Sequence, residues 1–145
     1  MNKMIIGRKD IADFPDFGLK SIEVKIDSGA YSCSIDCRNV HLIEKDGQQQ
    51  LEVVFLNPNR LEFKEEAFYF NDFKSKKVKS STGHTQIRYF IKAKIVLFEN
   101  TYETYFSLSK RSDMKTPVLI GRKLLNNNFV IDTKKVNLSH NFKRK

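Results

Sequence analysis

The most informative stretch of the sequence is Lys25-Ile26-Asp27-Ser28-Gly29-Ala30, in which Asp-Ser-Gly follows the end of a predicted strand. It continues the segment 21–26, in which apolar and charged residues alternate with the period of a half-buried strand. The strand would anchor the carboxylate, the Ser28 hydroxyl can donate a hydrogen bond, and Gly29 lets another backbone approach closely. Asp-Ser-Gly is also an ordinary turn tripeptide, so this stretch alone leaves a plain strand-end turn open.

A second segment favours a functional site over a plain turn. It runs Pro117-Val118-Leu119-Ile120-Gly121-Arg122-Lys123-Leu124-Leu125, apolar residues followed by glycine and the start of a short helix. This segment resembles the hydrophobic-hydrophobic-glycine segment of retropepsins, which an Arg and a Leu-Leu pair follow in retroviral proteases. In that family the segment lies beside the Asp-Ser/Thr-Gly loop and supports it. The two motifs occur here in the family's order.

The resemblance extends over most of the chain. It includes Gly7-Arg8 to Asp13, Phe14 to Leu19, Arg88-Tyr89-Phe90-Ile91 and Lys110 to Arg122. Together these segments resemble the bacterial family of retropepsin-like aspartic peptidases labelled ATP-dependent zinc protease. The resemblance implies an all-β, retropepsin-like (acid protease) closed β-barrel with one short helix near the C-terminus. Ser28 stands where the family usually has Thr, and Val40 to Ser80 matches nothing specific.

The remaining patterns also indicate strands. We predict strands at 51–56, 88–97 and 101–108, with a hairpin break at Phe98-Glu99-Asn100. Asn57 to Arg60 is a turn signal, and the polar, basic segment from Lys74 to Thr85 is expected to be a loop or a mobile hairpin tip. Only 122–127 is expected to be helical. A chain of 145 residues with 40% hydrophobic residues has material for one core, so we expect a single retropepsin-like domain over 1–145.

Composition limits the setting and the partners. The apolar run near the N-terminus is too short for a secretory signal, and no stretch is long enough to cross a bilayer, so we expect a cytoplasmic protein without a membrane partner. The formal net charge is +9, with basic residues concentrated in Lys74 to Lys79 and in Lys143-Arg144-Lys145. Charge alone permits RNA binding, but without a nucleic-acid motif or an aromatic-interleaved basic stripe it is not expected.

The residues give no support to zinc or ATP chemistry. His41, His84 and His140 are scattered and no His-Glu-x-x-His occurs, so we expect no metal site. Cys33 and Cys37 have no second pair with which to hold zinc, and we expect small buried thiols beside the active loop. The chain has no phosphate-binding loop, and no cofactor is expected.

The resemblance also assigns roles to residues. Aspartic peptidases need two carboxyl groups that share one proton, and this chain has one Asp-Ser/Thr-Gly; Asp132-Thr133 is followed by Lys134 rather than glycine. We therefore expect a homodimer acting on a peptide or protein substrate, in which each protomer supplies Asp27. The implied active-loop support consists of Ser28, Gly29, Ala30, Ile120, Gly121 and Arg122. The candidate flap, with a plain exposed loop as the alternative, consists of Ser81, Thr82, Gly83 and His84.

Other functions stay open at this point. The family's associations suggest a non-catalytic binding or assembly module that works with an ATP-grasp-type protein-modifying partner. A basic RNA- or ribosome-binding protein is the third class. Of these three functions only the peptidase needs Asp27, so the effect of replacing Asp27 distinguishes the peptidase from the other two. Charged residues also occur in the segments that carry the resemblance, and either surface salt bridges or a role in function explains them. They are Arg88, Arg111, Asp113 and Arg122.

Overall fold

The computed structural model describes residues 2–79 and 81–142. Ser80 and the basic tail Lys143 to Lys145 lie outside the described residues. Most of the described chain is β-structure, joined by a short 3₁₀ turn and one short helix. In chain order the elements are β1 (Met4–Ile6), β2 (Lys9–Phe14), η1 (Pro15–Phe17), β3 (Leu19–Ile26), β4 (Cys33–Lys45), β5 (Gln48–Phe55), β6 (Ala67–Phe70), β7 (Lys74–Lys79), β8 (Thr85–Leu97), β9 (Asn100–Ser109), β10 (Val118–Ile120), α1 (Arg122–Leu125) and β11 (Phe129–Ile131).

Six strands close into a barrel in the order β10-β3-β2-β8-β9-β4, and β10 returns to β4. The closing strand β10 is short and pairs on both sides, parallel to β3 with Ile120 opposite Ile26, and antiparallel to β4 with Val118 opposite Ile35. Closure removes the open sheet edges that would otherwise attract other chains. The predicted all-β, retropepsin-like closed barrel with one short helix near the C-terminus is confirmed.

Alternating side chains fill the barrel. On β3, Ile22, Val24 and Ile26 are buried while the residues between them are exposed, as the period-two pattern predicts. The ring of Phe14 meets Phe106 edge to face with centroids 5.5 Å apart. Each such side chain contributes roughly 1.5–3 kcal/mol when it leaves water. The core thus fixes the position of the strand that ends at Asp27.

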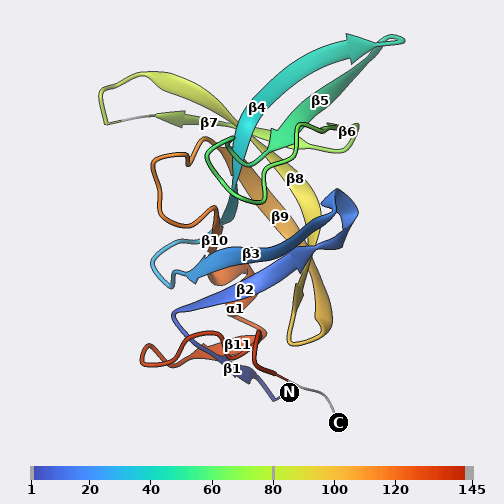
Figure 1. Ribbon diagram of the computed structural model, residues 1–145. Coiled ribbons are helices and arrows are strands. Elements are labelled where there is room, and N and C mark those ends of the chain that lie inside the picture. The colour runs from blue at the N-terminus through green and yellow to red at the C-terminus, as the bar shows by residue number, and fades with distance from the viewer. Residues whose placement is uncertain (1, 80, 143–145) are drawn as a thin grey trace.

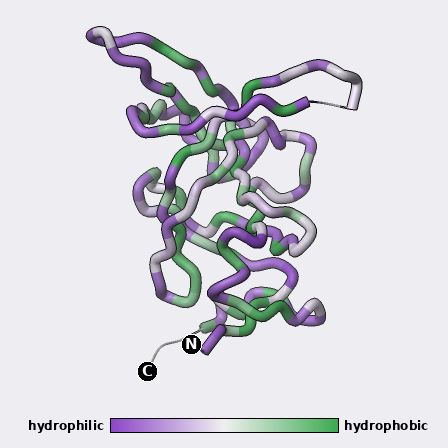
Figure 2. Tube along the Cα trace, turned by 180° about the vertical axis from the view of Figure 1, so that it is seen from behind, coloured by the Kyte–Doolittle hydropathy of each residue, from purple (hydrophilic) through white to green (hydrophobic). Residues whose placement is uncertain are grey.

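Two hairpins project from the barrel (Figure 1). One consists of β4 and β5, with β6 added along β5; the other consists of β7 and β8. β5, β6 and β7 lie in the region that resembled nothing specific, whereas β8 lies after it. Hydrophilic residues occupy the tip of the β4–β5 hairpin (Figure 2).

The polar segment from Lys74 to Thr85 is more regular than a loop. Lys74–Lys79 forms β7 and pairs antiparallel with β8, and the hairpin tip begins only after it. This strand lies at an edge and is mostly exposed, so four lysines are tolerated there and protect the edge from other strands. The predicted break before β9 is a tight turn in which Phe98 and Glu99 both have positive φ, 54° and 60°.

The first and last strands lie together at the end of the molecule opposite the β4–β5 tip (Figure 1). β1 pairs in parallel with β11, with Met4 opposite Phe129 and Ile6 opposite Ile131. Gly7 allows this closeness, because a Cβ there would stand 2.1 Å from the carbonyl oxygen of Lys135. In the described part of the chain no helix is long and apolar enough to cross a membrane.

Candidate active site

Asp27 is held by backbone hydrogen bonds on a tight loop at the end of β3. Its amide donates to the carbonyl oxygen of Ile120 at 2.9 Å, so β10 fixes the point where the strand stops. Its side-chain oxygen Oδ1 accepts from the amide of Gly29 at 2.8 Å, and its carbonyl accepts from the amide of Ala30 at 3.2 Å. The residue is half-buried, so the fixed carboxylate can still reach a reactant.

Gly121 and the start of α1 hold the far side of this loop. The amides of Arg122 and Lys123 donate to the carbonyls of Ala30 and Tyr31 at 2.8 and 2.9 Å. A Cβ on Gly121 would stand 2.5 Å from the carbonyl oxygen of Ser32 and 2.8 Å from those of Ala30 and Tyr31. Only glycine permits this approach, which the sequence predicted for a supporting segment.

The arginine after Gly121 binds the loop through its side chain. Nη1 of Arg122 donates to the carbonyl oxygen of Ser28 at 2.9 Å. Ser28 and Gly29 are exposed, and within the described residues the ion pairs join Arg38 to Glu65 and Arg60 to Asp36. Neither of these ion pairs includes Arg122, and its guanidinium binds the backbone of the loop.

Both cysteines are buried free thiols, as the sequence predicted. The sulfur of Cys33 accepts a 3.4 Å hydrogen bond from the amide of Gly121, which places this thiol directly behind the active loop. Burial raises the pKa of Cys33 and raises that of Cys37 well above its ordinary value. These thiols are packing groups rather than nucleophiles.

Asp36, which the sequence did not mark as a site residue, is a buried carboxylate that holds together the loops containing Asn57, Arg60 and Arg111. Asp36 is fully buried in β4 and accepts hydrogen bonds from the amides of Asn57 and Arg111 and from Nε of Arg60, at 3.0, 2.7 and 2.7 Å. Arg60 in turn donates to the carbonyls of Arg111 and Met114. Asp36 belongs to no recognisable motif in the sequence, because it is a single acidic residue among the buried residues of β4.

Arg111 connects this network to the active loop. Its Nη1 lies 3.4 Å from the hydroxyl of Ser34, and its Nε is buried without a hydrogen-bond partner among the described residues. Burial lowers the pKa of its guanidinium, while the negative charges of Asp36 and Asp27 raise it. The positive charge of Arg111 is therefore attracted to both Asp36 and Asp27.

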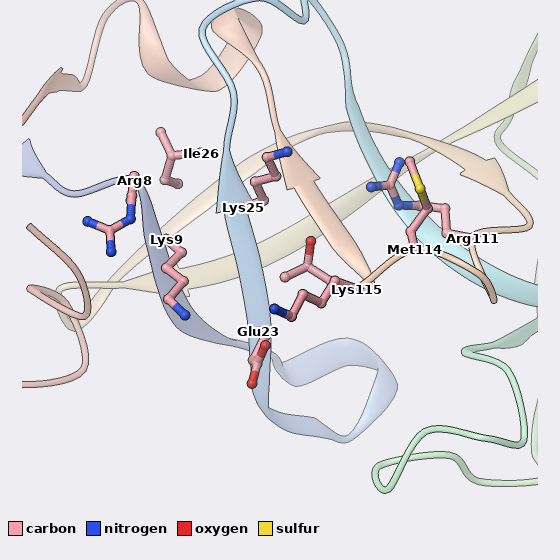
Figure 3. Close-up of a pocket in the computed structure, with 9 residues that line it drawn as sticks. Arg8, Lys9, Glu23, Lys25, Ile26, Arg111, Met114 and Lys115 are labelled. Carbon is pink, nitrogen blue, oxygen red and sulfur yellow. The ribbon is translucent and has the colours of Figure 1, made fainter. Parts of the chain in front are cut away.

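A cavity of about 390 Å³ opens along the outer side of β3, and its lining includes Ile26, the residue before Asp27. Its lining has five basic residues and one acidic residue, Glu23 (Figure 3). The basic residues come from the start of β2, from β3 and from the segment before β10. They are Arg8, Lys9, Lys25, Arg111 and Lys115.

The candidate flap residues form the tip of the β7–β8 hairpin. Ser81, Thr82, Gly83 and His84 are all exposed, and Gly83 has a φ of +88° with no atom within 4 Å of the position its Cβ would take. The structure brings Asp27, Ser28, Gly29, Ala30, Ile120, Gly121 and Arg122 together, and leaves the tip residues on a separate projection. Their role as a flap stays a prediction.

Metal ligands do not gather in the described residues: no group of three or more His, Cys, Asp or Glu comes together in 2–79 and 81–142. Asp132, which we rejected as a second catalytic motif, accepts a hydrogen bond from the amide of Lys134 at 3.0 Å and so caps its own turn. Its backbone amide binds Ile6 beside the β1–β11 pair.

Comparison with known proteins identifies a family and a fold. Residues 5–141 match a family described as RimB-like, retropepsin-like aspartic endopeptidase RimB. Two curated relatives are probable alpha-L-glutamate ligases: the protein from Desulfotalea psychrophila is 27% identical over 131 residues, and that from Shewanella pealeana is 28% identical over 134 residues. Each alignment covers 90% of this chain but only 28% and 29% of the respective relative, so the chain spans less than a third of their length.

A crystal structure of a Legionella pneumophila protein of unknown function has the same fold. The TM-score is 0.70 at 22% sequence identity, and the superposition covers 95% of this chain and 99% of that one.

Proposed function

The chain belongs to the RimB-like family of retropepsin-like aspartic endopeptidases, and from this premise we propose that it hydrolyses peptide bonds as a homodimer. Asp27 of each protomer would supply one carboxyl group of the catalytic pair. The observation that carries the proposal is the fixed loop: Ile120 binds the Asp27 backbone and the Gly29 amide binds the Asp27 carboxylate, while Ser28 and Gly29 are exposed. A second copy can approach that face.

In the proposed mechanism the two Asp27 carboxyl groups share one proton, since two like charges close together cannot both ionise cheaply. The ionised carboxylate removes a proton from a water molecule as the water oxygen bonds to the peptide carbonyl carbon. The protonated carboxyl donates its proton to the carbonyl oxygen. The resulting diol collapses as the C–N bond breaks: the nitrogen takes a proton from the first carboxyl, and one diol hydroxyl gives its proton to the second, now ionised, carboxylate as the C=O bond re-forms. The hydrogen bond from Gly29 to Asp27 Oδ1 would keep the carboxylates oriented.

Subunit mixing tests the shared pair. Wild-type and Asp27→Asn protein are mixed in varying ratio at constant total protein concentration, and peptide cleavage is measured after exchange. Because a mixed dimer has only one Asp27, activity should fall with the square of the wild-type fraction. Tyr69→Phe protein, altered on the β4–β6 sheet, is the matched control and should not reduce activity in the mixture. Activity that falls in direct proportion to the wild-type fraction would mean that each protomer works alone.

We propose that the substrate is a peptide with acidic side chains near the cut bond. The cavity that begins at Ile26, one residue before Asp27, carries the five basic residues and one acidic residue. The name of the relatives, glutamate ligases, is consistent with an acidic chain. Such a field favours carboxylate-bearing substrates and repels basic ones.

A peptide series tests this preference. Peptides of equal length with Glu, Gln or Lys around the cut bond should be cleaved in that order. Lys25→Gln combined with Lys115→Gln should raise KM for the Glu peptide about tenfold, as the loss of two weak charge contacts. Lys20→Gln on the same strand but outside the cavity is the matched control. If Lys peptides are cleaved as fast as Glu peptides, the acidic preference is wrong while the peptidase proposal stands.

A second candidate function is a non-catalytic module that works with an ATP-grasp-type ligase. It is favoured by the match to one part of the probable alpha-L-glutamate ligases. Under this alternative the Asp27→Asn protein would bind and support its ligase as well as the parent does. A ligase assay with and without each protein distinguishes the two.

A further inference from the structure

The fold gathers basic and aromatic side chains that are scattered in the sequence onto one outer face of the barrel. The ring of Tyr105 on β9 has three ammonium groups around it: Lys74 of β7 at 4.3 Å, Lys123 of α1 at 5.5 Å and Lys92 of β8 at 5.8 Å from the ring centre. Tyr31, after the active loop, has Arg122 and Lys123 at 5.8 and 6.0 Å. We call this surface the Tyr105 face: Tyr31, Lys74, Lys92, Tyr105, Arg122 and Lys123.

The charges of the Tyr105 face are not neutralised within the protein. In residues 2–79 and 81–142 the ion pairs are Arg38–Glu65 and Arg60–Asp36, and neither includes a residue of this face. Lys74, Lys92 and Lys123 are exposed. The three ammonium groups around the Tyr105 ring repel one another. An anion bound among them would be attracted to each of them and would also reduce this repulsion, and both effects favour its binding.

The face is separate from the acidic-peptide cavity, because none of its residues lines that cavity. The aromatic rings distinguish between two polyanions. An acidic peptide gains nothing from the face of a tyrosine, whereas a nucleic acid base can stack on it while lysines bind the neighbouring phosphates. Tyr31 is 58% exposed and offers such a face.

We propose that the Tyr105 face binds single-stranded nucleic acid, through phosphate contacts to Lys74, Lys92, Arg122 and Lys123 and through base stacking on Tyr31 and Tyr105. This proposal goes beyond the peptidase function and does not depend on it. Because the sequence has no basic stripe interleaved with aromatics, nucleic-acid binding was not expected from it. The interleaving exists only after β7, β8, β9 and α1 come together.

The test is fluorescence anisotropy with the full chain and a labelled oligouridine of about 12 nucleotides, a length within the span of single-strand sites. Four phosphate contacts predict a slope of about −2.8 for log affinity against log salt, at about −0.7 for each contact. Lys74→Gln combined with Lys92→Gln should reduce the slope to about −1.4. Tyr105→Leu should weaken binding about tenfold without changing the slope, and Tyr105→Phe, which keeps the ring, should bind like the parent.

The matched control is Lys94→Gln, which removes one positive charge two residues along β8, where Lys94 lies opposite Glu103. It should change affinity less than about twofold, as expected for an exposed charge that meets no phosphate. Circular dichroism and thermal unfolding establish that each variant is folded. No binding at low salt overturns the proposal. The proposal is also overturned if Lys94→Gln and Lys92→Gln lose equal affinity for the oligouridine. It is overturned in favour of an acidic-peptide surface if a poly-glutamate peptide binds as tightly as the oligouridine and Tyr105→Leu does not weaken that binding.

Discussion

The loop around Asp27 and the tip of the β7–β8 hairpin differ in how the rest of the molecule holds them. Backbone groups of Ile120, Arg122 and Lys123 bind the Asp27 loop, and Gly121 is in close contact with three of its carbonyls. The tip at 81–84 is exposed, and open space surrounds Gly83. The carboxylate therefore stands on backbone that neighbouring segments fix, while the segment proposed to cover a substrate is exposed at the end of a projecting hairpin.

The largest effect is expected at Asp27. Asp27→Asn should reduce peptide turnover at least about a thousandfold, since the amide can act neither as base nor as acid. Its side-chain oxygen can still accept the hydrogen bond from Gly29, so the free energy of unfolding should change by less than about 1 kcal/mol. Turnover and urea unfolding are measured on the same preparation. Parent-like cleavage by the variant would remove Asp27 from the chemistry.

Gly121→Ala should have the next largest effect, on stability. A Cβ at 2.5 Å from the Ser32 carbonyl must push backbone away, which should lower the free energy of unfolding by about 3 kcal/mol. Activity should fall with it, because the displaced backbone carries Asp27. Denaturant unfolding gives the stability change. A neutral substitution would show that the close contact does not constrain the loop.

Gly83→Ala is the matched glycine substitution in the exposed tip of the β7–β8 hairpin. The added methyl meets no atom, so only the positive φ opposes it, and the free energy of unfolding should fall by about 1 kcal/mol or less. If the tip moves over the substrate, KM and turnover should change together by a few-fold while Asp27 chemistry is intact. A stability loss as large as that of Gly121→Ala would erase the contrast between the two regions.

The smallest effect concerns the thiol behind the active loop. Cys33 should react slowly with a thiol reagent in the native protein, because it is buried and burial raises its pKa, which reduces the thiolate. In Gly121→Ala the reaction should speed up several-fold, and in Gly83→Ala it should not. The rates are measured with Cys37→Ala as the background, so that one thiol is followed. Equal rates in both glycine variants would contradict the selective loosening of the loop.

Local pattern was enough to predict a mostly β chain, while the closed barrel and the supporting role of the Gly121 segment came from the resemblance to retropepsins. The alternation in β3, the Asp-Ser-Gly turn and the glycine at 121 each reflect backbone requirements that short sequence windows record. The strand at Lys74–Lys79 was assigned to a loop because its lysines hide the period-two pattern, and only its pairing with β8 specifies it.

The parts that sequence could not predict depend on contacts between distant residues. Asp36 is stabilised by Arg60 and by the amide of Arg111, which are 24 and 75 residues away in sequence. The Tyr105 face likewise draws on four elements. Lys74, Lys92 and Lys123 are 31, 13 and 18 residues from Tyr105 in sequence, so their positions along the chain do not predict that they meet its ring.

The support of the Asp27 loop by late segments has a consequence for synthesis. Arg122 and Ser28, whose hydrogen bond helps to hold the loop, are 94 residues apart in sequence, and β1 pairs with β11 at the far end of the barrel. During translation the segment with Asp27 therefore emerges long before its partners, and a barrel built on such distant pairings forms slowly, on the order of milliseconds to seconds. A nascent chain would carry the aspartate without its supporting backbone, so cleavage would be withheld until the closing strand had been made.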